Sequence, residues 1–73
     1  MPKLPVVSGK ECRKVLARLG FTEVRQRGSH VVMRRGDSGC VVPQHAELRT
    51  GTLAGILRQA GLSAEEFISA IGR

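Results

Sequence analysis

The sequence of 73 residues is poor in aromatic side chains, with two phenylalanines and neither tyrosine nor tryptophan. RRM and OB-fold modules bind single strands by stacking bases on aromatic residues, so the composition argues against these classes. Long apolar runs are also missing: no stretch approaches the roughly 20 residues of a membrane span, and residues 1–7 lack the apolar core of a signal peptide. We therefore expect a cytoplasmic protein without a membrane partner.

Cysteine is equally scarce. Cys12 and Cys40 are the only two, and without signs of secretion both are expected to be reduced thiols. A zinc site built from Cys12, His30, Cys40 and His45 is disfavoured, because structural zinc ligands usually come in close-spaced pairs and only Cys40 and His45 are near each other. No metal and no cofactor are predicted.

What the chain has in excess is positive charge, with 12 Lys+Arg against 6 Asp+Glu, a net charge of +6 and a pI of about 10.8. Such an excess in a short chain indicates a polyanionic partner, although a merely soluble basic surface is the simpler alternative. A domain of this size buries one small core. Any functional site is therefore expected to be a shallow surface patch, which suits a polymer better than a small metabolite.

Capping signals and periodic apolar residues predict three helices. After an extended lead-in over residues 2–7, Ser8 and Glu11 form a capping box, and Gly20 is placed to end the first helix. A second helix is predicted to start at residues 50–52 and to end at Gly61. A last short helix starts at Ser63, which repeats the capping box with Glu66. The apolar faces of the three helices are Cys12, Val15, Leu16 and Leu19; Leu53, Ile56, Leu57 and Ala60; and Phe67, Ile68 and Ile71.

Three strands are predicted between the first two helices, over residues 22–27, 30–35 and 40–42. Gly28-Ser29 and the run 36–39 are turn signals that favour two hairpins. The predicted fold class is α+β in the order α-β-β-β-α-α, with a three-stranded antiparallel sheet that carries the helices on one face. This is the arrangement of a double-stranded-RNA-binding-type domain with an extra terminal helix.

The motif Gly28-Ser29-His30 places a histidine at the start of a strand, just after the turn. Histidine can take or give a proton near neutral pH, and arginine binds phosphate through its planar fork. Nearby positive charges disfavour the imidazolium and so favour the neutral form that a general base requires. This cluster indicates chemistry on a nucleic-acid backbone, whereas a lone strand histidine is more often structural. The flanking arginines are Arg25, Arg27, Arg34 and Arg35.

Three local patterns together resemble the HicA (YcfA-like) toxin family of bacterial toxin–antitoxin systems. They are Arg27-Gly28-Ser29-His30, Pro43-Gln44-His45, and Gly51-Thr52-Leu53 through Ile56-Leu57 to Ala60-Gly61-Leu62-Ser63. The resemblance implies a single HicA-like mRNA interferase domain over residues 1–73, with the double-stranded-RNA-binding-like fold. It also implies cleavage of mRNA, neutralisation by a HicB-type antitoxin, and His30 as the catalytic residue. The chain departs from many members at Met33, where they carry an aromatic residue.

The implied reaction is attack of a ribose 2′-hydroxyl on the adjacent phosphate, with His30 as proton acceptor and Arg27 and Arg34 as candidates for stabilising the phosphoryl oxygens. The sequence offers no metal-binding carboxylate cluster, since Asp37 falls in a turn and Glu65 and Glu66 at a helix start. Metal-independent cleavage is therefore predicted, giving 2′,3′-cyclic phosphate and 5′-hydroxyl ends.

Other site residues are assigned with alternatives. His45 is a candidate for the acid that protonates the leaving oxygen, but a loop histidine bonding local backbone is favoured. Ser29 donates to phosphate or, more simply, caps the turn, and Gly28 allows a positive φ or close approach of RNA. The residues predicted to bind RNA are Arg25, Arg27, Gly28, Arg34, Arg35, Lys10 and Lys14.

Two rival functions use the same basic surface. One is a non-catalytic RNA-binding module, and the other is an interaction protein that docks an acidic partner. An antitoxin is expected to cover His30 and to place acidic or polar groups against Arg27, Arg34 and Arg35.

Overall fold

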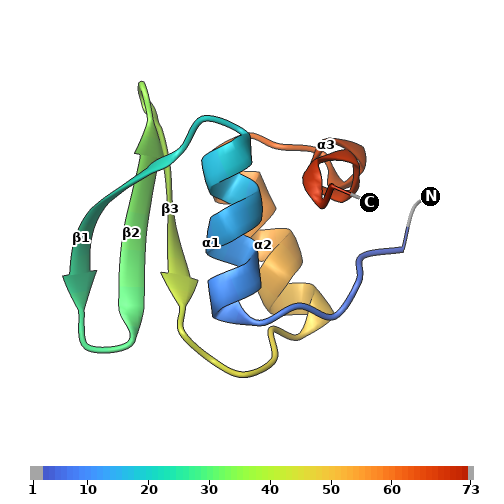
Figure 1. The fold of residues 1–73 in the computed structure, drawn as a ribbon, viewed down its shortest axis with the longest axis horizontal. Coiled ribbons are helices and arrows are strands. Elements are labelled where there is room, and N and C mark those ends of the chain that lie inside the picture. Colours follow the sequence, from blue (N-terminus) through green and yellow to red (C-terminus); the bar gives the residue numbers. More distant parts are fainter. Residues whose placement is uncertain (1–2, 73) are drawn as a thin grey trace.

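The computed structural model describes residues 3–72, which form three helices and one antiparallel sheet (Figure 1). The predicted α+β class, the element order α-β-β-β-α-α and the open three-stranded sheet in the order β1-β2-β3 are confirmed. Of the predicted extended lead-in, residue 2 lies outside the described residues, and Val7 forms an isolated bridge with Leu48. The elements are α1 (Gly9–Arg18), β1 (Thr22–Arg27), β2 (His30–Arg35), β3 (Ser38–Pro43), α2 (Thr50–Ala60) and α3 (Ala64–Ala70).

The ends of α1 are set by residues that the sequence indicates. The Ser8 hydroxyl accepts from the Glu11 amide while the Glu11 carboxylate accepts from the Ser8 amide, which completes the capping box. Gly20 adopts a φ of 96°, and the amide of Phe21 donates to the carbonyl of Leu16 at 3.0 Å. This is the hydrogen bond of a Schellman motif, which ends the helix. The second predicted capping box, at the start of α3, is also present.

Both hairpins have two-residue loops that begin with a glycine of positive φ. Gly28 has a φ of 54° between the paired residues Arg27 and His30, and Gly36 has a φ of 58° in the second loop. Because the second loop uses only residues 36 and 37, β3 begins at Ser38. The strand predicted over 40–42 is therefore too short at its start.

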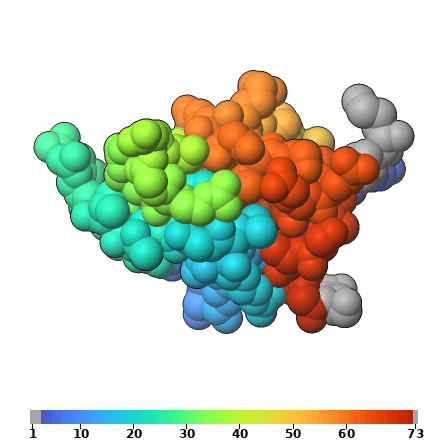
Figure 2. All heavy atoms as spheres, turned by 90° about the horizontal axis from the view of Figure 1, so that it is seen from above, coloured from blue at the N-terminus to red at the C-terminus, as the bar shows by residue number. Residues whose placement is uncertain are grey.

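The core lies between the helices and one face of β2 and β3. Alternate residues of these strands are buried, whereas all six residues of β1 are exposed. Figures 1 and 2 show the β1–β2 end of the sheet projecting from the helical body. Met33 is 1% exposed within this core, so its side chain packs against apolar neighbours and is not placed to contact RNA. The largest fully buried side chains are Phe67, Leu16, Met33, Leu48, Leu53, Val31, Val42 and Cys12.

Helix α2 packs beside β3, with Leu53, Ile56, Leu57 and Ala60 buried as the periodicity predicts. At its C-terminal end, the Gln59 Oε1 accepts from the Val41 amide at 3.4 Å. In α3 only Phe67 of the predicted apolar face is buried, while Ile68 and Ile71 are half-buried. The position of α2 beside the last strand creates the groove in which the candidate site lies.

Candidate functional site

His30 is the first residue of β2 and lies directly after the Gly28-Ser29 loop. Its cross-strand neighbours are Arg27 on β1 and Pro43 on β3. The side chain is exposed, and neither ring nitrogen makes a hydrogen bond within the described residues 3–72. Both nitrogens are therefore available to a ligand, as a proton-transfer role requires.

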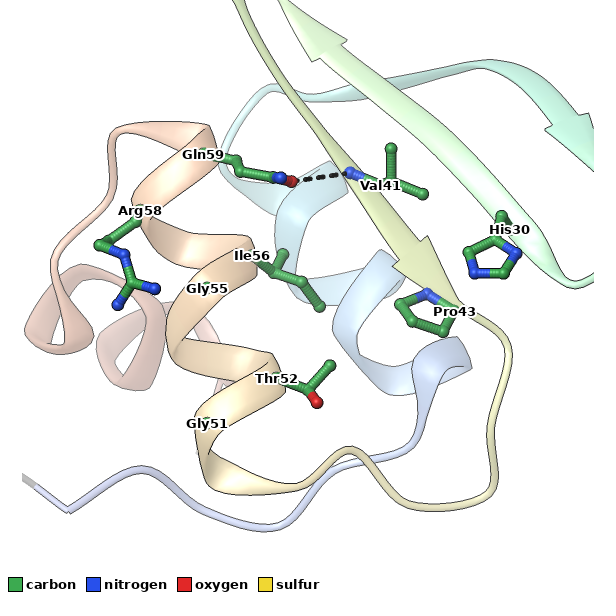
Figure 3. A pocket seen from close by; sticks show the side chains of 9 residues that line it. All are labelled: His30, Val41, Pro43, Gly51, Thr52, Gly55, Ile56, Arg58 and Gln59. Atoms are coloured by element: carbon green, nitrogen blue, oxygen red, sulfur yellow. Dashed lines mark hydrogen bonds between the residues drawn. The ribbon is translucent and has the colours of Figure 1, made fainter.

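A groove of about 400 Å³ opens between β3 and α2, and His30 lies at its sheet side (Figure 3). Thr52, Ile56 and Gln59 point from α2 toward the sheet, while Arg58 lies on the far side of the helix. No aspartate or glutamate lines this groove. The residues that line it are His30, Val41 and Pro43 from the sheet and Gly51, Thr52, Gly55, Ile56, Arg58 and Gln59 from α2.

Three of the predicted arginines share the face of the sheet that carries His30. Arg27 pairs with His30, and Arg25 pairs with Val32, which is two residues along β2 from His30. Side chains of paired residues lie on the same face, and alternate residues of a strand return to it, so Arg34 also belongs to this face. The side chains of Arg25 and Arg27 make no hydrogen bond among the described residues, and the Arg34 side chain makes one long bond, 3.4 Å to the Gly36 carbonyl. We call Arg25, Arg27 and Arg34 the arginine face.

Arg35 is placed differently from the other three. Strand alternation puts it on the side of Val31 and Met33, toward the helices. Its Nη1 donates to the Leu19 carbonyl at 2.7 Å, and its guanidinium lies 4.8 Å from the centre of the Phe21 ring. Arg35 therefore holds the end of α1 against the sheet, and a ligand that covers His30 does not reach it on the same face.

The two predicted lysines also lie apart from the groove. Lys10 and Lys14 line a small depression between α1 and β1, which shares no residue with the groove beside His30. The same depression contains Arg13 and Glu23, whose side chains form an ion pair at 2.6 Å. These lysines form a second basic surface, separate from the arginine face.

The remaining predicted residues are tied into the backbone around the site. The Gln44 amide donates to the Ser29 carbonyl at 2.6 Å, which joins the β1–β2 loop to the segment after β3. The His45 carbonyl accepts from the Gly9 amide at 2.9 Å, while its imidazole is exposed and does not line the groove. The structure thus gives the His45 backbone a contact with the start of α1 and leaves its imidazole outside the lining of the groove.

Sequence reasoning missed Gly9, which supports this segment. A Cβ at residue 9 would overlap the Pro43 carbonyl oxygen and lie 2.9 Å from the Cα of Gln44. The start of α1 therefore packs directly on the backbone that leads from β3 past His30's neighbour Pro43. No local signal distinguishes this glycine, because its requirement comes from a segment more than 30 residues away.

The α2 side of the groove was also missed as a site. Thr52, Gly55, Arg58 and Gln59 line it, but the sequence indicates only a helix start and an apolar face there. The signal that could have found it is the pair Gly51 and Gly55, four residues apart in one helix. That spacing leaves one stripe of the helix without side chains.

The two cysteines are buried thiols. Burial raises the pKa of Cys12 to about 12, with a further contribution from the neighbouring Cys40, and burial also raises the pKa of Cys40. Neither is exposed for chemistry. Among residues 3–72 there is no group of three or more His, Cys, Asp or Glu side chains that could hold a metal ion.

This geometry defines a small basic α+β domain whose one exposed strand histidine stands between an arginine face and a groove. Residues 9–62 of the 73-residue chain match the family described as HicA toxin of bacterial toxin–antitoxin systems. The chain therefore belongs to the HicA toxin family, as the three motifs predict, and membership implies a cognate antitoxin. A search of curated proteins found no match. None of the helices within residues 3–72 has the length and apolar character needed to cross a membrane.

Proposed function

We propose that the protein is a metal-independent endoribonuclease in which His30 acts as the general base. The observation that carries this proposal is the position of His30: an exposed imidazole without a hydrogen-bonded partner, on the same sheet face as three arginines. A proton acceptor beside several phosphate-binding cations is the combination that cleavage of a polyanion needs. Acting on mRNA, such an enzyme arrests translation and growth.

In the proposed reaction, a neutral His30 takes the proton from a ribose 2′-hydroxyl. The 2′-oxygen forms a bond to the adjacent phosphorus, and the bond from phosphorus to the 5′-oxygen of the next nucleotide breaks. The leaving oxygen takes a proton from water or from a side chain, and the products carry a 2′,3′-cyclic phosphate and a 5′-hydroxyl. RNA supplies its own nucleophile, so DNA is not a substrate.

The arginine face has two tasks in this reaction. Arg27, the direct neighbour of His30 across the β1–β2 pair, stabilises the negative charge that grows on the phosphoryl oxygens. Arg25 and Arg34 bind flanking phosphates and so hold the chain of RNA in register. Arg35 is not part of this proposal, because its guanidinium is engaged by Leu19 and Phe21.

The antitoxin that family membership implies is proposed to be a HicB-type protein that covers His30. The arginine face attracts acidic or polar groups, and a partner seated there blocks both phosphate binding and proton transfer. A complex in which His30 stayed open to RNA would contradict this mode of inhibition.

The experiment that tests the function is incubation of the purified protein with a structured RNA in excess EDTA, beside its His30→Ala variant. A general base contributes typically about 10²- to 10⁴-fold, so the variant is expected to be nearly inactive while it still folds and binds RNA. Cyclic phosphate ends on the products, and protection of RNA by a single 2′-deoxyribose at the cleaved site, support the proposed chemistry.

Two results would refute the proposal. Equal cleavage by both proteins removes His30 from the chemistry. Tight binding that leaves the RNA intact favours the alternative function, a non-catalytic RNA-binding module on the same surface.

A further inference from the structure

The proposed chemistry uses only the His30 side of the groove between β3 and α2, and leaves its other wall without a role. That wall contains Gly51 and Gly55, one turn apart. Apart from the adjoining residues and the backbone of α2 itself, nothing lies within 4 Å of the place that a Cβ would take at Gly51, and at Gly55 the one neighbour is Arg58 Nη2 at 3.7 Å. Nothing in the packing requires glycine there, and glycine inside a helix is destabilising. The two glycines thus leave one stripe of α2 open along the groove.

The surface beside this open wall is apolar. Val41 is 39% exposed, and together with Pro43 and Ile56 it presents aliphatic carbon to the groove. Enzymes that read an unstacked base hold its ring between aromatic or apolar side chains and contact its edge by hydrogen bonds. The apolar part of the groove fits the first requirement.

Gln59 fits the second requirement. Its Oε1 accepts from the Val41 amide at 3.4 Å, and this bond orients the carboxamide at the side of the groove. Its Nε2 donates to no group within residues 3–72, and the same holds for the Thr52 hydroxyl and the Arg58 guanidinium. A carboxamide whose Nε2 donors are free beside the groove can distinguish bases by the acceptors on their edges.

The size and charge of the groove indicate whether a paired or an unpaired nucleotide can occupy it. Its volume of about 400 Å³ is near the lower end of the roughly 300–1,000 Å³ of ligand pockets, which admits one nucleotide. A base that is stacked and paired in a duplex cannot enter such a groove, whereas a base splayed out from a single strand can. The lining carries no acidic residue, and Arg27 borders the groove as the cross-strand partner of His30, which favours an anionic ligand.

We infer that the groove binds the base of an unpaired nucleotide next to the phosphate at His30, and that Gln59 determines which base is accepted. This inference rests on the proposed function in taking RNA as the ligand. It adds a substrate class, single-stranded RNA, and a residue that sets sequence preference.

The test measures binding separately from cleavage. Short single-stranded RNA oligonucleotides carry one 2′-deoxyribose, which removes the nucleophile at one site, and differ only in the base on either side of that site. The wild-type protein is expected to prefer one base over the least favoured by about tenfold or more, the scale of a good side-chain contact to a base edge. Gln59→Ala is expected to bring that ratio to about one to two, because the discriminating contact is gone.

Two further variants separate a filled groove from a damaged fold. Gly55→Leu places a side chain in the groove and improves helix propensity, so it is expected to weaken binding of every oligonucleotide while resisting urea at least as well as wild type. Thr50→Ala is the matched control, since Thr50 belongs to α2 but does not line the groove. It is expected to leave base preference unchanged.

Equal binding of all bases by the wild type overturns the inference, as does an unchanged preference in Gln59→Ala. The all-ribose versions of the same oligonucleotides report on the proposed function independently. Base-dependent binding without cleavage refutes the ribonuclease but leaves the groove assignment standing. Cleavage without base-dependent binding supports the ribonuclease and refutes the groove assignment.

Discussion

Arg27 and His30 are direct cross-strand partners, joined by the two-residue loop of Gly28 and Ser29. One tight hairpin therefore places the proposed proton acceptor and its nearest guanidinium on the same face of the sheet. Their relative position depends on a local turn and on antiparallel pairing, not on a long loop.

Arg27→Ala is expected to reduce cleavage by about 10- to 100-fold, because a hydrogen bond to a charged group contributes about 1.5–3 kcal/mol. It is also expected to lower the slope of log affinity against log salt by about 0.7, the value for one phosphate contact to a single strand. Binding measured over a salt series checks this. Arg49→Ala is the control, since Arg49 is exposed outside the groove, and equal slopes in the two variants would contradict the phosphate role.

Arg34 and Arg35 are adjacent in sequence but lie on opposite faces of β2, so the same substitution should have opposite effects at the two positions. Arg35→Ala loses the bond to the Leu19 carbonyl and the contact with the Phe21 ring, and is expected to lower the free energy of unfolding by about 1–2 kcal/mol. RNA affinity is expected to stay unchanged. Arg34→Ala should weaken RNA binding with little loss of stability. Urea unfolding and RNA titration of both variants measure the two effects. Loss of stability in Arg34→Ala together with loss of RNA affinity in Arg35→Ala would contradict the RNA-binding role of Arg34.

Gly9→Ala should be strongly destabilising despite the higher helix propensity of alanine. The added Cβ meets the backbone of Pro43 and Gln44, which cannot turn aside as a flexible side chain can. Overpacking of this kind costs about 1–3 kcal/mol. Gly55→Ala is the matched control in the other helix, where the Cβ has room, and it should gain about 0.5–1 kcal/mol. Urea midpoints that fall in the opposite order would show that α1 does not pack on this segment.

The free energy of unfolding is expected to fall as the pH rises above about 9 because of Cys12. Burial raises the pKa of this thiol from 9.0 to about 12 in the folded protein. Below pH 9 the thiol is neutral in both states and contributes no pH dependence. Between pH 9 and about 12 the unfolded chain loses the proton while the folded chain keeps it. The unfolded state is then favoured by up to about 1.4 kcal/mol per pH unit.

Urea unfolding at pH 8 and pH 10 measures this dependence. Cys12→Ala opens a cavity and lowers stability at both pH values, but its decline between them is expected to be shallower than that of the wild type. The same decline in both proteins would show that the Cys12 thiol is not the group responsible.

The two histidines are expected to differ sharply in cleavage assays. His45 interacts with Gly9 through its carbonyl oxygen, and its imidazole is outside the groove. His45→Ala is therefore expected to retain activity within a few-fold of wild type, against the loss of about 10²- to 10⁴-fold for His30→Ala. Comparison of kcat/KM for the two variants on one RNA tests this. A comparable loss in both would identify His45 as the proton donor to the leaving oxygen.

Local sequence determined the elements of this fold well, because their ends depend on short-range hydrogen bonds. Ser8 with Glu11 and Ser63 with Glu66 form the capping boxes that their spacing predicts, and Gly20 and Gly61 end their helices with a left-handed φ. Each of these features is complete within a few residues of chain. The position of His30 after a Gly-Ser turn belongs to the same class of local feature.

Only the tertiary structure decided which residues share a surface with His30. Pairing and alternation separate Arg34 from Arg35, although both flank the histidine in sequence. Packing of α2 beside β3 brings Thr52 and Gln59 to the groove from more than 20 residues away, and packing of α1 on Pro43 explains Gly9. Burial of Met33 likewise follows from the side of β2 that the helices cover. These relationships depend on the register of strands and the docking of helices, which arise from the summed burial of a whole apolar core, and no short motif encodes them.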